Sequence, residues 1–262
     1  MRKIIINGFP HTGTTILRRI IGDHPDVLDW EAETYDVRAE DLMKGDPPLQ
    51  THLVCKFVGL PIQIYPYDVT RIWLIKNPWD VFGSIYRRLG TSWKTAPGYQ
   101  IKDYLNFIER WLIERVQFID MTIKYEDYFK EPKYLEWIWD RCDLSYTKGI
   151  AHRAAGMGSR APIPDQEPPR HMSMDFRTWQ INQPIEDKTY QSAPHCPLEI
   201  LRVLGDYPII QDAGYHMRNV DGLWFPVGAK LTSLENGQLI VADPKRPQEE
   251  IVGIVTNKGL ET

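Results

Sequence analysis

The stretch Lys3-Ile-Ile-Ile-Asn-Gly-Phe-Pro-His-Thr-Gly-Thr-Thr15 lies at the start of the chain and decides its fold class. The β-branched residues Ile4 to Ile6 predict a strand that is buried on both faces, as in a parallel sheet. After the glycines, apolar residues recur at helical spacing and predict a helix over residues 14–21, which ends at Gly22. A glycine-containing loop therefore joins a buried strand to a helix.

Strands and helices continue to alternate after this first pair. Residues 53–58, 72–75 and 121–124 predict further strands, and Asn77-Pro78 ends the second of them by starting a helix. Residues 104–118 predict an amphipathic helix with one apolar face, and 134–139 lie in another helix. The apolar face comprises Leu105, Ile108, Leu112, Ile113 and Val116. This alternation predicts an α/β fold with a doubly wound parallel sheet flanked by helices, over residues 1–216.

The pattern changes near the end of the chain, where residues 217–262 predict a small β extension. Residues 230–242 alternate about Asn236-Gly237, a dipeptide suited to a tight hairpin turn, and 251–255 predict a third strand. Such a module suits docking to a larger assembly or formation of a homo-oligomer. A simple extension that caps the core is the alternative.

The composition narrows the class of protein. The 262 residues are 42% hydrophobic and 25% charged, as in globular proteins with a proper core. The net charge of −4 disfavours general binding to nucleic acid or to an anionic membrane. The three cysteines form no CxxC pair, and no stretch approaches the roughly 20 apolar residues that span a bilayer. We therefore expect a cytoplasmic protein with reduced thiols.

The loop Gly8-Phe-Pro-His-Thr-Gly-Thr-Thr15 has the outline of a phosphate-binding loop. Glycines let the backbone curl around an anion, and the following helix directs its N–H groups and positive dipole toward that anion. ATP-hydrolysing loops carry a lysine after the second glycine, but this chain has Thr14. The sequence thus predicts a phosphate cradle without the lysine that clamps a triphosphate. A ligand-free turn is the alternative.

A second segment, Arg71-Ile-Trp-Leu-Ile-Lys-Asn-Pro-Trp-Asp-Val-Phe-Gly-Ser-Ile-Tyr-Arg-Arg88, places Lys76 at a strand end and Ser84 in the following helix. This segment resembles the 3′-phosphate-binding element of sulfotransferases that use 3′-phosphoadenosine-5′-phosphosulfate (PAPS). The loop Pro10-His-Thr-Gly-Thr-Thr15 is similar to the 5′-phosphosulfate loop of that family. Three further segments, around residues 24–31, 122–132 and 175–179, also resemble the family in the same order.

The resemblance implies a donor site for PAPS, with adenosine 3′,5′-bisphosphate (PAP) as the product and no metal. It assigns the 5′ end of the donor to the loop and the 3′-phosphate to Lys76, Ser84 and Arg88. Arg160 lies where the family returns a basic loop over the donor. The loop residues concerned are Pro10, His11, Thr12, Gly13, Thr14 and Thr15. The chemistry would be transfer of a sulfuryl group by in-line attack, catalysed by positioning and by cations.

The sequence departs from the family at residues close to the chemistry. His11 stands where the family places lysine or arginine against the bridging oxygen of the donor, and a histidine can donate a hydrogen bond there. Lys56 corresponds to a lysine that assists at the same oxygen in cytosolic members, whereas Val58 replaces their histidine. Glu31 matches the position of the catalytic glutamate in other relatives and is the predicted general base, with Glu33 as the second candidate.

The sequence is also compatible with two other functions. A small-molecule kinase is disfavoured by Thr14 and by the lack of an evident magnesium carboxylate. A non-catalytic nucleotide-binding or assembly protein would be compatible with His11 and with Lys76, which replaces the family arginine and loses its bidentate fork. The acceptor, a hydroxyl or an amine of a small molecule or glycan, is not specified. Trp93 and Tyr99 are candidates for its pocket.

Overall fold

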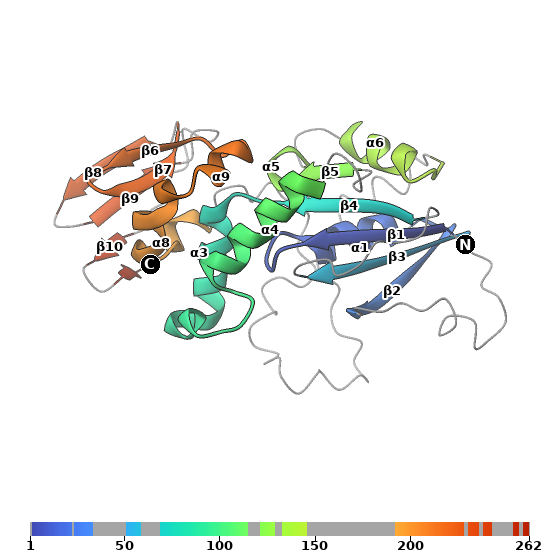
Figure 1. Cartoon of the computed structure of the whole chain (residues 1–262), viewed down its shortest axis with the longest axis horizontal. Coiled ribbons are helices and arrows are strands. Elements are labelled where there is room, and N and C mark those ends of the chain that lie inside the picture. Colours follow the sequence, from blue (N-terminus) through green and yellow to red (C-terminus); the bar gives the residue numbers. More distant parts are fainter. Residues whose placement is uncertain are drawn as a thin grey trace. The chain divides into compact units, whose positions relative to one another are not determined.

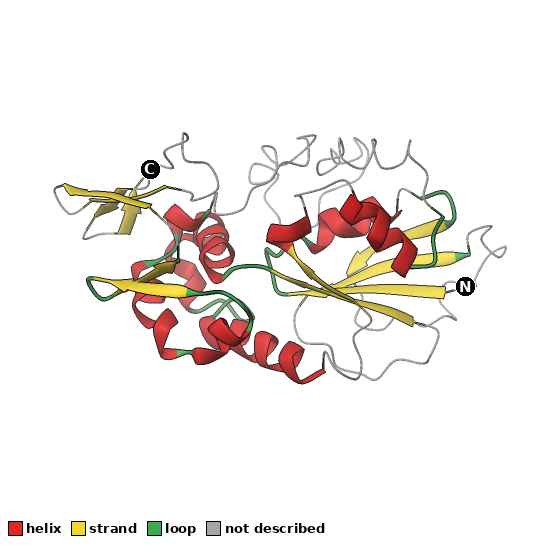
Figure 2. Ribbon diagram, turned by 90° about the horizontal axis from the view of Figure 1, so that it is seen from above, coloured by secondary structure: helices red, strands yellow, loops and turns green. Residues whose placement is uncertain are grey.

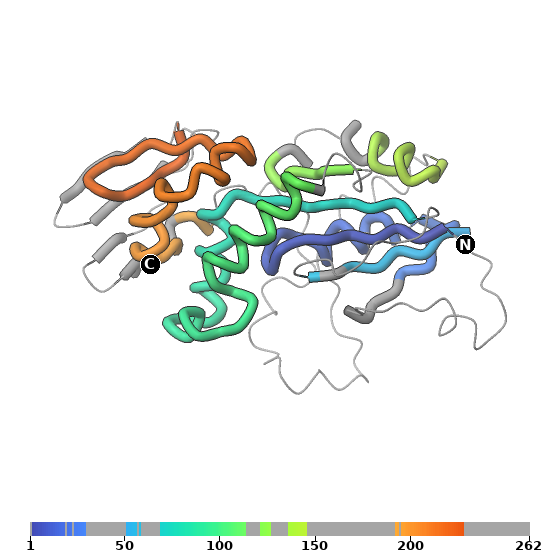
Figure 3. Tube along the Cα trace, viewed as in Figure 1, coloured from blue at the N-terminus to red at the C-terminus, as the bar shows by residue number. Residues whose placement is uncertain are grey.

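The computed structural model describes residues 2–22, 24–33, 51–58, 69–114, 121–128, 133–145, 192–227, 230–235, 238–242, 254–256 and 259–261, which are coloured in Figure 1. Figure 3 traces the backbone in the same view. The chain divides into two compact units, which are described separately. Unit 1 comprises Met1–Gly8, Gly13–Leu74 and Gln117–Asp187. Unit 2 comprises Phe9–Thr12, Ile75–Val116 and Lys188–Thr262.

Unit 1 is built on a five-stranded sheet with the strand order β2-β3-β1-β4-β5 (Figure 1). The strands are β1 (Arg2–Gly8), β2 (Val27–Glu33), β3 (His52–Val58), β4 (Val69–Ile75) and β5 (Met121–Lys124). The central strand β1 pairs in parallel with β3 and β4, and β2 pairs in parallel with β3. This arrangement confirms the predicted parallel α/β sheet.

One face of this sheet is covered by helices, as Figure 2 shows. Helices α1 (Thr14–Gly22) and α6 (Lys133–Arg141) contribute to a core that also takes alternate residues of the strands. Its members include Ile4, Ile6, Leu17, Ile20, Ile21, Val54, Ile72, Leu74, Ile138 and Trp139. Each fully buried aliphatic side chain contributes about 1.5–3 kcal/mol to folding. A short helix, α5 (Tyr125–Tyr128), directly follows β5.

Strand β2 is the one strand of the sheet that the sequence did not indicate. Its residues, Val-Leu-Asp-Trp-Glu-Ala-Glu, mix acidic with apolar side chains and lack the β-branched run of β1. Because β2 lies at an edge of the sheet, it needs no continuous apolar pattern. Edge strands of this kind are defined by pairing with a neighbour rather than by their own composition.

Unit 2 contains the helices between β4 and β5 and those after residue 192. These are α3 (Pro78–Leu89), η1 (Gly90–Lys94), α4 (Ile101–Glu114), η4 (Ala193–His195), α8 (Leu198–Val203), η5 (Leu204–Asp206) and α9 (Pro208–Asp212). Helix α4 was predicted, and of the apolar face assigned to it Ile108 is buried and Leu105 and Leu112 are half-buried, but Ile113 is 69% exposed, so its place on that face is wrong. The other buried side chains are Tyr104, Phe107 and Trp111. Aromatic packing sets the rotation of this helix: the Phe9 ring lies 5.3 Å from Tyr104 and 6.0 Å from Phe107.

The C-terminal part of unit 2 consists of hairpins. Strands β8 (Lys230–Glu235) and β9 (Gln238–Ala242) form the predicted antiparallel hairpin, and β10 (Ile254–Thr256) pairs with β11 (Gly259–Glu261). An earlier hairpin, β6 (Met217–Val220) with β7 (Leu223–Pro226), was not predicted. Its signal was Asp221-Gly222, whose φ values of 52° and 81° suit a two-residue turn of type I′.

This first hairpin packs on the helical part of unit 2. The indole Nε1 of Trp79 in α3 donates a hydrogen bond of 2.9 Å to the carbonyl oxygen of Trp224 in β7. The ring of Trp224 lies against Gly205, where a Cβ would meet it at 1.9 Å. Residues 217–226 are therefore anchored to α3 and η5. The division of the chain into a domain of residues 1–216 and a β extension of residues 217–262 stays a prediction.

The start of α3 is fixed by a buried polar cluster. Asn77 caps the helix, its side-chain oxygen accepting a hydrogen bond of 2.8 Å from the backbone N–H of Asp80. The Asp80 carboxylate is fully buried and accepts hydrogen bonds from Asn77 Nδ2 at 2.9 Å and from the backbone N–H of Ser192 at 2.8 Å. The Asn-Pro-x-Asp turn thus holds residue 192 against the helix.

Among the described residues, no helix is both long enough and apolar enough to cross a membrane.

We expect Gly83→Ala to lower the free energy of unfolding by about 2–3 kcal/mol. A Cβ on this helical glycine would lie 1.8 Å from the carbonyl oxygen of Ser192, so residue 192 must move. On an open helix face the same change would stabilise the protein by about 1 kcal/mol. The sign of the change in unfolding free energy therefore distinguishes a packed Gly83 from an open one. Urea unfolding measures it, with Arg87→Ala on the exposed side of α3 as the control. A stabilised Gly83→Ala variant would contradict this packing.

Candidate nucleotide-phosphate site

The first half of the phosphate loop is a tight turn in unit 2. The backbone N–H and the hydroxyl of Thr12 both donate to the carbonyl oxygen of Phe9, at 3.2 and 2.7 Å. Pro10 occupies the second position of this turn, and His11 occupies the third with a φ of 67°. A turn with proline second and a positive φ third is of type II, which favours glycine at the third position. Histidine is held there at a conformational cost of about 1–3 kcal/mol.

The second half of the loop, in unit 1, starts helix α1. Gly13 has a φ of 98°, and a Cβ on it would lie 3.0 Å from the ring of Tyr125. Its carbonyl oxygen accepts from the N–H groups of Ile16 and Leu17, both at 3.1 Å. The preceding N–H groups, of Thr14 and Thr15, have no acceptor within the helix. The first turn of α1 contains no acidic residue, so its positive dipole is not neutralised.

Lys56 brings a cation to this helix start from the neighbouring strand. In the sheet register, Lys56 of β3 is the partner of Ile6 in β1, so it lies on the face that α1 covers. Its Nζ donates a hydrogen bond of 2.7 Å to Oγ1 of Thr15, and the residue is only 7% exposed. The loop has no lysine at position 14, and Lys56 of β3 places a positive charge at the same helix start instead.

His11 contacts the segment that was predicted to bind the 3′-phosphate. Its Nδ1 shares a hydrogen bond of 2.9 Å with the hydroxyl of Ser84 in α3, although 73 residues separate the two. Lys76 directly follows β4 and is 7% exposed; its carbonyl oxygen accepts a hydrogen bond of 2.8 Å from the hydroxyl of Tyr104. Arg88 is half-buried in the last turn of α3. The structure thus brings His11 and Ser84 together within unit 2.

Two of the predicted site residues are not described at the level of their side chains. The backbone of Glu31 lies in β2 within a register irregularity between Asp29 and Glu33, and Glu33 is the register partner of Lys56. Irregularities of this kind re-aim side chains and are frequent beside active sites. Arg160 lies outside the described residues. The roles of Glu31 and Arg160 stay predictions.

The two aromatic candidates for an acceptor pocket differ in their surroundings. Trp93 is 7% exposed, with its ring 6.3 Å from that of Phe82, and so belongs to the core of unit 2. Tyr99 is half-buried, with its ring 6.2 Å from the imidazole of His11. The contact of Tyr125 with Gly13 and that of Lys56 with Thr15 could not be predicted, because both join elements that are distant in the chain.

Two of the cysteines and two of the histidines among the described residues lie outside the phosphate loop, and burial changes their pKa values. Burial raises the pKa of the Cys55 thiol to about 12 and raises the pKa of Cys196 as well, so neither supplies a thiolate at neutral pH. Burial lowers the pKa of His52 and of His195. The described part of the chain contains no group of three or more His, Cys, Asp or Glu that could hold a metal ion.

Comparison with known proteins gives a distant likeness. No family model and no curated protein matches the chain. A mouse sulfotransferase complexed with PAP matches with a TM-score of 0.43 and 17% identity, over 58% of this chain and 64% of that one. Retinol dehydratase in complex with androsterone and PAP matches with a TM-score of 0.39 and 15% identity, over 59% and 64% of the two chains.

The sulfotransferase domain of a Synechococcus olefin synthase matches with a TM-score of 0.43 and 16% identity, over 72% of this chain and 92% of that one. The chain resembles sulfotransferases. It spans less than two thirds of the length of the mouse enzyme and of retinol dehydratase. The likeness concerns the fold.

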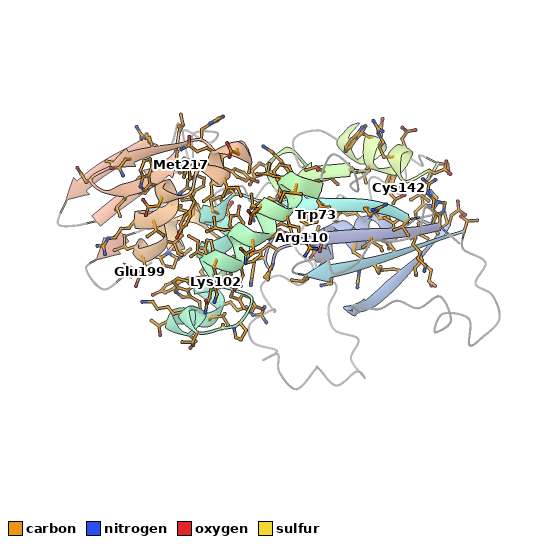
Figure 4. All side chains as sticks on the ribbon, viewed as in Figure 1. Trp73, Lys102, Arg110, Cys142, Glu199 and Met217 are labelled. Atoms are coloured by element: carbon orange, nitrogen blue, oxygen red, sulfur yellow. The ribbon has the colours of Figure 1, made fainter. Side chains whose placement is uncertain are left out.

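Inorganic pyrophosphate is expected to bind the wild-type protein, and Lys56→Met is expected to weaken this binding about tenfold. Loss of one charge-assisted contact to an anion accounts for that factor. Methionine keeps the buried aliphatic part of Lys56 but not its charge. The change in pyrophosphate affinity that calorimetry measures therefore reports the loss of the positive charge alone. Lys102→Met, on the exposed side of α4 (Figure 4), serves as the matched control and should bind like the wild type. Equal affinities in all three proteins would exclude Lys56 from the anion site.

Proposed function

We propose that this chain is a sulfotransferase that transfers the sulfuryl group of PAPS to a hydroxyl or an amine. The observation that carries the proposal is the 2.9 Å hydrogen bond between His11 and Ser84. His11 lies in the segment predicted to hold the 5′-phosphosulfate, and Ser84 lies in the segment predicted to hold the 3′-phosphate. We infer a ligand that contacts both segments and carries one anionic group for each, as PAPS does.

The proposed donor contacts begin at the loop. The N–H groups at the start of α1 and the hydroxyl of Thr15 are proposed to bind the 5′-phosphate, because the start of a helix favours anions. Ser84, with Lys76 and Arg88, is proposed to bind the 3′-phosphate. Arg160 is proposed as a further cation for the donor. No step of this scheme needs a metal ion.

Catalysis in this proposal is in-line displacement at sulfur. The acceptor oxygen forms a bond to sulfur while the bond between sulfur and the bridging phosphate oxygen breaks, which releases PAP and a sulfate ester. Negative charge grows on the bridging oxygen, and His11 and Lys56 stabilise it. Glu31 takes the proton that the acceptor hydroxyl loses. A cytoplasmic location and docking through residues 217–262 stay expectations from the sequence.

Selective binding of PAP is the test of the donor site. We expect PAP to raise the melting temperature of the protein and ATP with Mg²⁺ to raise it much less, because position 14 lacks the lysine that holds a triphosphate. Calorimetry with both nucleotides gives the two dissociation constants. A preference for ATP with Mg²⁺ would indicate a kinase instead. Failure to bind either nucleotide would indicate an assembly protein.

Glu31→Gln is expected to lower turnover by about 10²–10⁴-fold, the usual contribution of a general base. The amide keeps the size of the side chain but cannot accept the proton, so the dissociation constant for PAP should stay within a factor of three. Glu33→Gln, on the same strand, is the matched control and should retain most of the turnover. If Glu33→Gln loses activity and Glu31→Gln keeps it, the base has been assigned to the wrong glutamate.

A further inference from the structure

Strand β2 is held against helix α1 at Asp29. The Nε atom of Arg18, in the second turn of α1, lies 2.9 Å from Oδ1 of Asp29, and only 3% of the Arg18 side chain is exposed. Gly22 approaches the same aspartate one turn later, because a Cβ on this glycine would lie 2.7 Å from the Cβ of Asp29. Residues four apart in a helix share one face. An ion pair and a close backbone approach therefore fix Asp29 at the same face of α1.

The other end of the irregular part of β2 is connected to the start of the same helix. Glu33 is the register partner of Lys56 in β3, and Nζ of Lys56 donates a hydrogen bond to Oγ1 of Thr15. Thr15 lies three residues before Arg18, so it belongs to the face of α1 that also holds Asp29. The backbone of β2 is thus fixed relative to α1 on both sides of residue 31.

Between these two points β2 carries more residues than its neighbour. The register partners of Asp29 and Glu33 are two residues apart in β3, so residues 30–32 stand opposite a single residue. Such a segment lacks the regular ladder of the remaining sheet. Because β2 lies at an edge of the sheet (Figure 1), it pairs with one neighbouring strand alone. The contacts at its two ends must then set the conformation of the segment.

The neighbouring cations distinguish the three acidic residues of β2. Asp29 has Arg18 as its ion-pair partner. Glu33 stands beside Lys56 in the register, whereas Glu31 has no register partner on β3. A cation close to a carboxylate lowers its affinity for a proton. This pattern is consistent with Glu31 as the proton acceptor and with Asp29 as a fixed point of the strand.

We propose that Arg18 is a positioning residue for the reaction: through Asp29 it fixes the irregular segment of β2 and so places Glu31 at the acceptor. The inference rests on the proposed sulfotransferase function, in which Glu31 takes the proton of the acceptor. Arg18 acts on Glu31 through the strand and not on the reacting atoms. Displacement of a catalytic group by about 1 Å can lower a rate about 10²-fold, so the support of Glu31 has a measurable effect.

Transfer of the sulfuryl group to water tests the inference without a known acceptor. The water oxygen bonds to sulfur, the bond from sulfur to the bridging oxygen breaks, and Glu31 takes the proton, which leaves sulfate and PAP. Chromatography measures the PAP that is released from PAPS. Calorimetry with PAP counts the binding sites in each preparation. Turnover is expressed per binding site, so that loss of folded protein is not mistaken for loss of position.

Three variants change the support of β2. Arg18→Met removes the cation, Asp29→Asn removes the charge of its partner, and Gly22→Ala displaces Asp29 without a change of charge. If Arg18→Met does not fold, the other two variants decide. Arg18→Lys keeps a cation at the same place. Arg2→Met is the matched control, because Arg2 and Asp143 form another Arg–Asp pair of unit 1, at 3.1 Å, which is exposed.

We expect each of the three variants to lower the turnover per binding site about 10- to 100-fold. The KM for PAPS and the Kd for PAP should change by no more than about threefold, because the donor contacts stay in place. Arg18→Lys should recover part of the loss, and Arg2→Met should resemble the wild type. In a protein that already carries Glu31→Gln, Arg18→Met should cause almost no further loss, since the two residues act as one unit.

Several results would overturn the inference. Equal losses from Arg18→Met with Glu31 and with Gln at position 31 would show that Arg18 acts independently of Glu31. Wild-type turnover per binding site in Asp29→Asn and Gly22→Ala would remove the support. PAPS that stays intact on a wild type able to bind PAP would exclude a working base. Failure of the wild type to bind PAP would reject the proposed function itself, and it is recognised separately because that binding is measured first.

Discussion

The site depends on a constraint on the backbone directly after β1, where the chain must adopt positive φ at both His11 and Gly13. Proline before His11 sets up the first of these turns, and the absence of a side chain at Gly13 permits the second, against the ring of Tyr125. One reversal gives the His11 ring its hydrogen bond to Ser84; the other starts α1 with open N–H groups. Both features of the proposed anion site therefore follow from a few residues that leave the central strand of the sheet.

The cations around this loop do not come from the loop itself. Position 14 holds a threonine, so the lysine of an ATP-binding loop is missing, and Lys56 reaches Thr15 from β3 instead. A buried lysine is costly unless it is hydrogen-bonded, and a bound phosphate would offset that cost further. Asp80 is also buried, but its carboxyl group joins the cap of α3 to residue 192.

Much of the fold could be predicted because its central elements carry strong local signals. The run Ile4 to Ile6 and the spacing of Leu17, Ile20 and Ile21 identify β1 and α1 without reference to other parts of the chain. Edge strand β2 and the rotation of α4 could not be predicted, since pairing with β3 and packing of aromatic rings decide them. Within the site, the loop and Ser84 were visible as motifs, whereas the contacts of Lys56 with Thr15 and of Tyr99 with His11 arise only when distant segments meet.

We propose above all that the ligand is a nucleotide with phosphates at both ends of its adenosine. The most direct measurement is calorimetric titration of the wild-type protein with PAP and, in parallel, with adenosine 5′-phosphate, which differs only by lacking the 3′-phosphate. Because the 3′-phosphate would accept a pair of charge-assisted hydrogen bonds, we predict that PAP binds at least about tenfold more tightly than adenosine 5′-phosphate. Equal affinities for the two nucleotides would contradict the account.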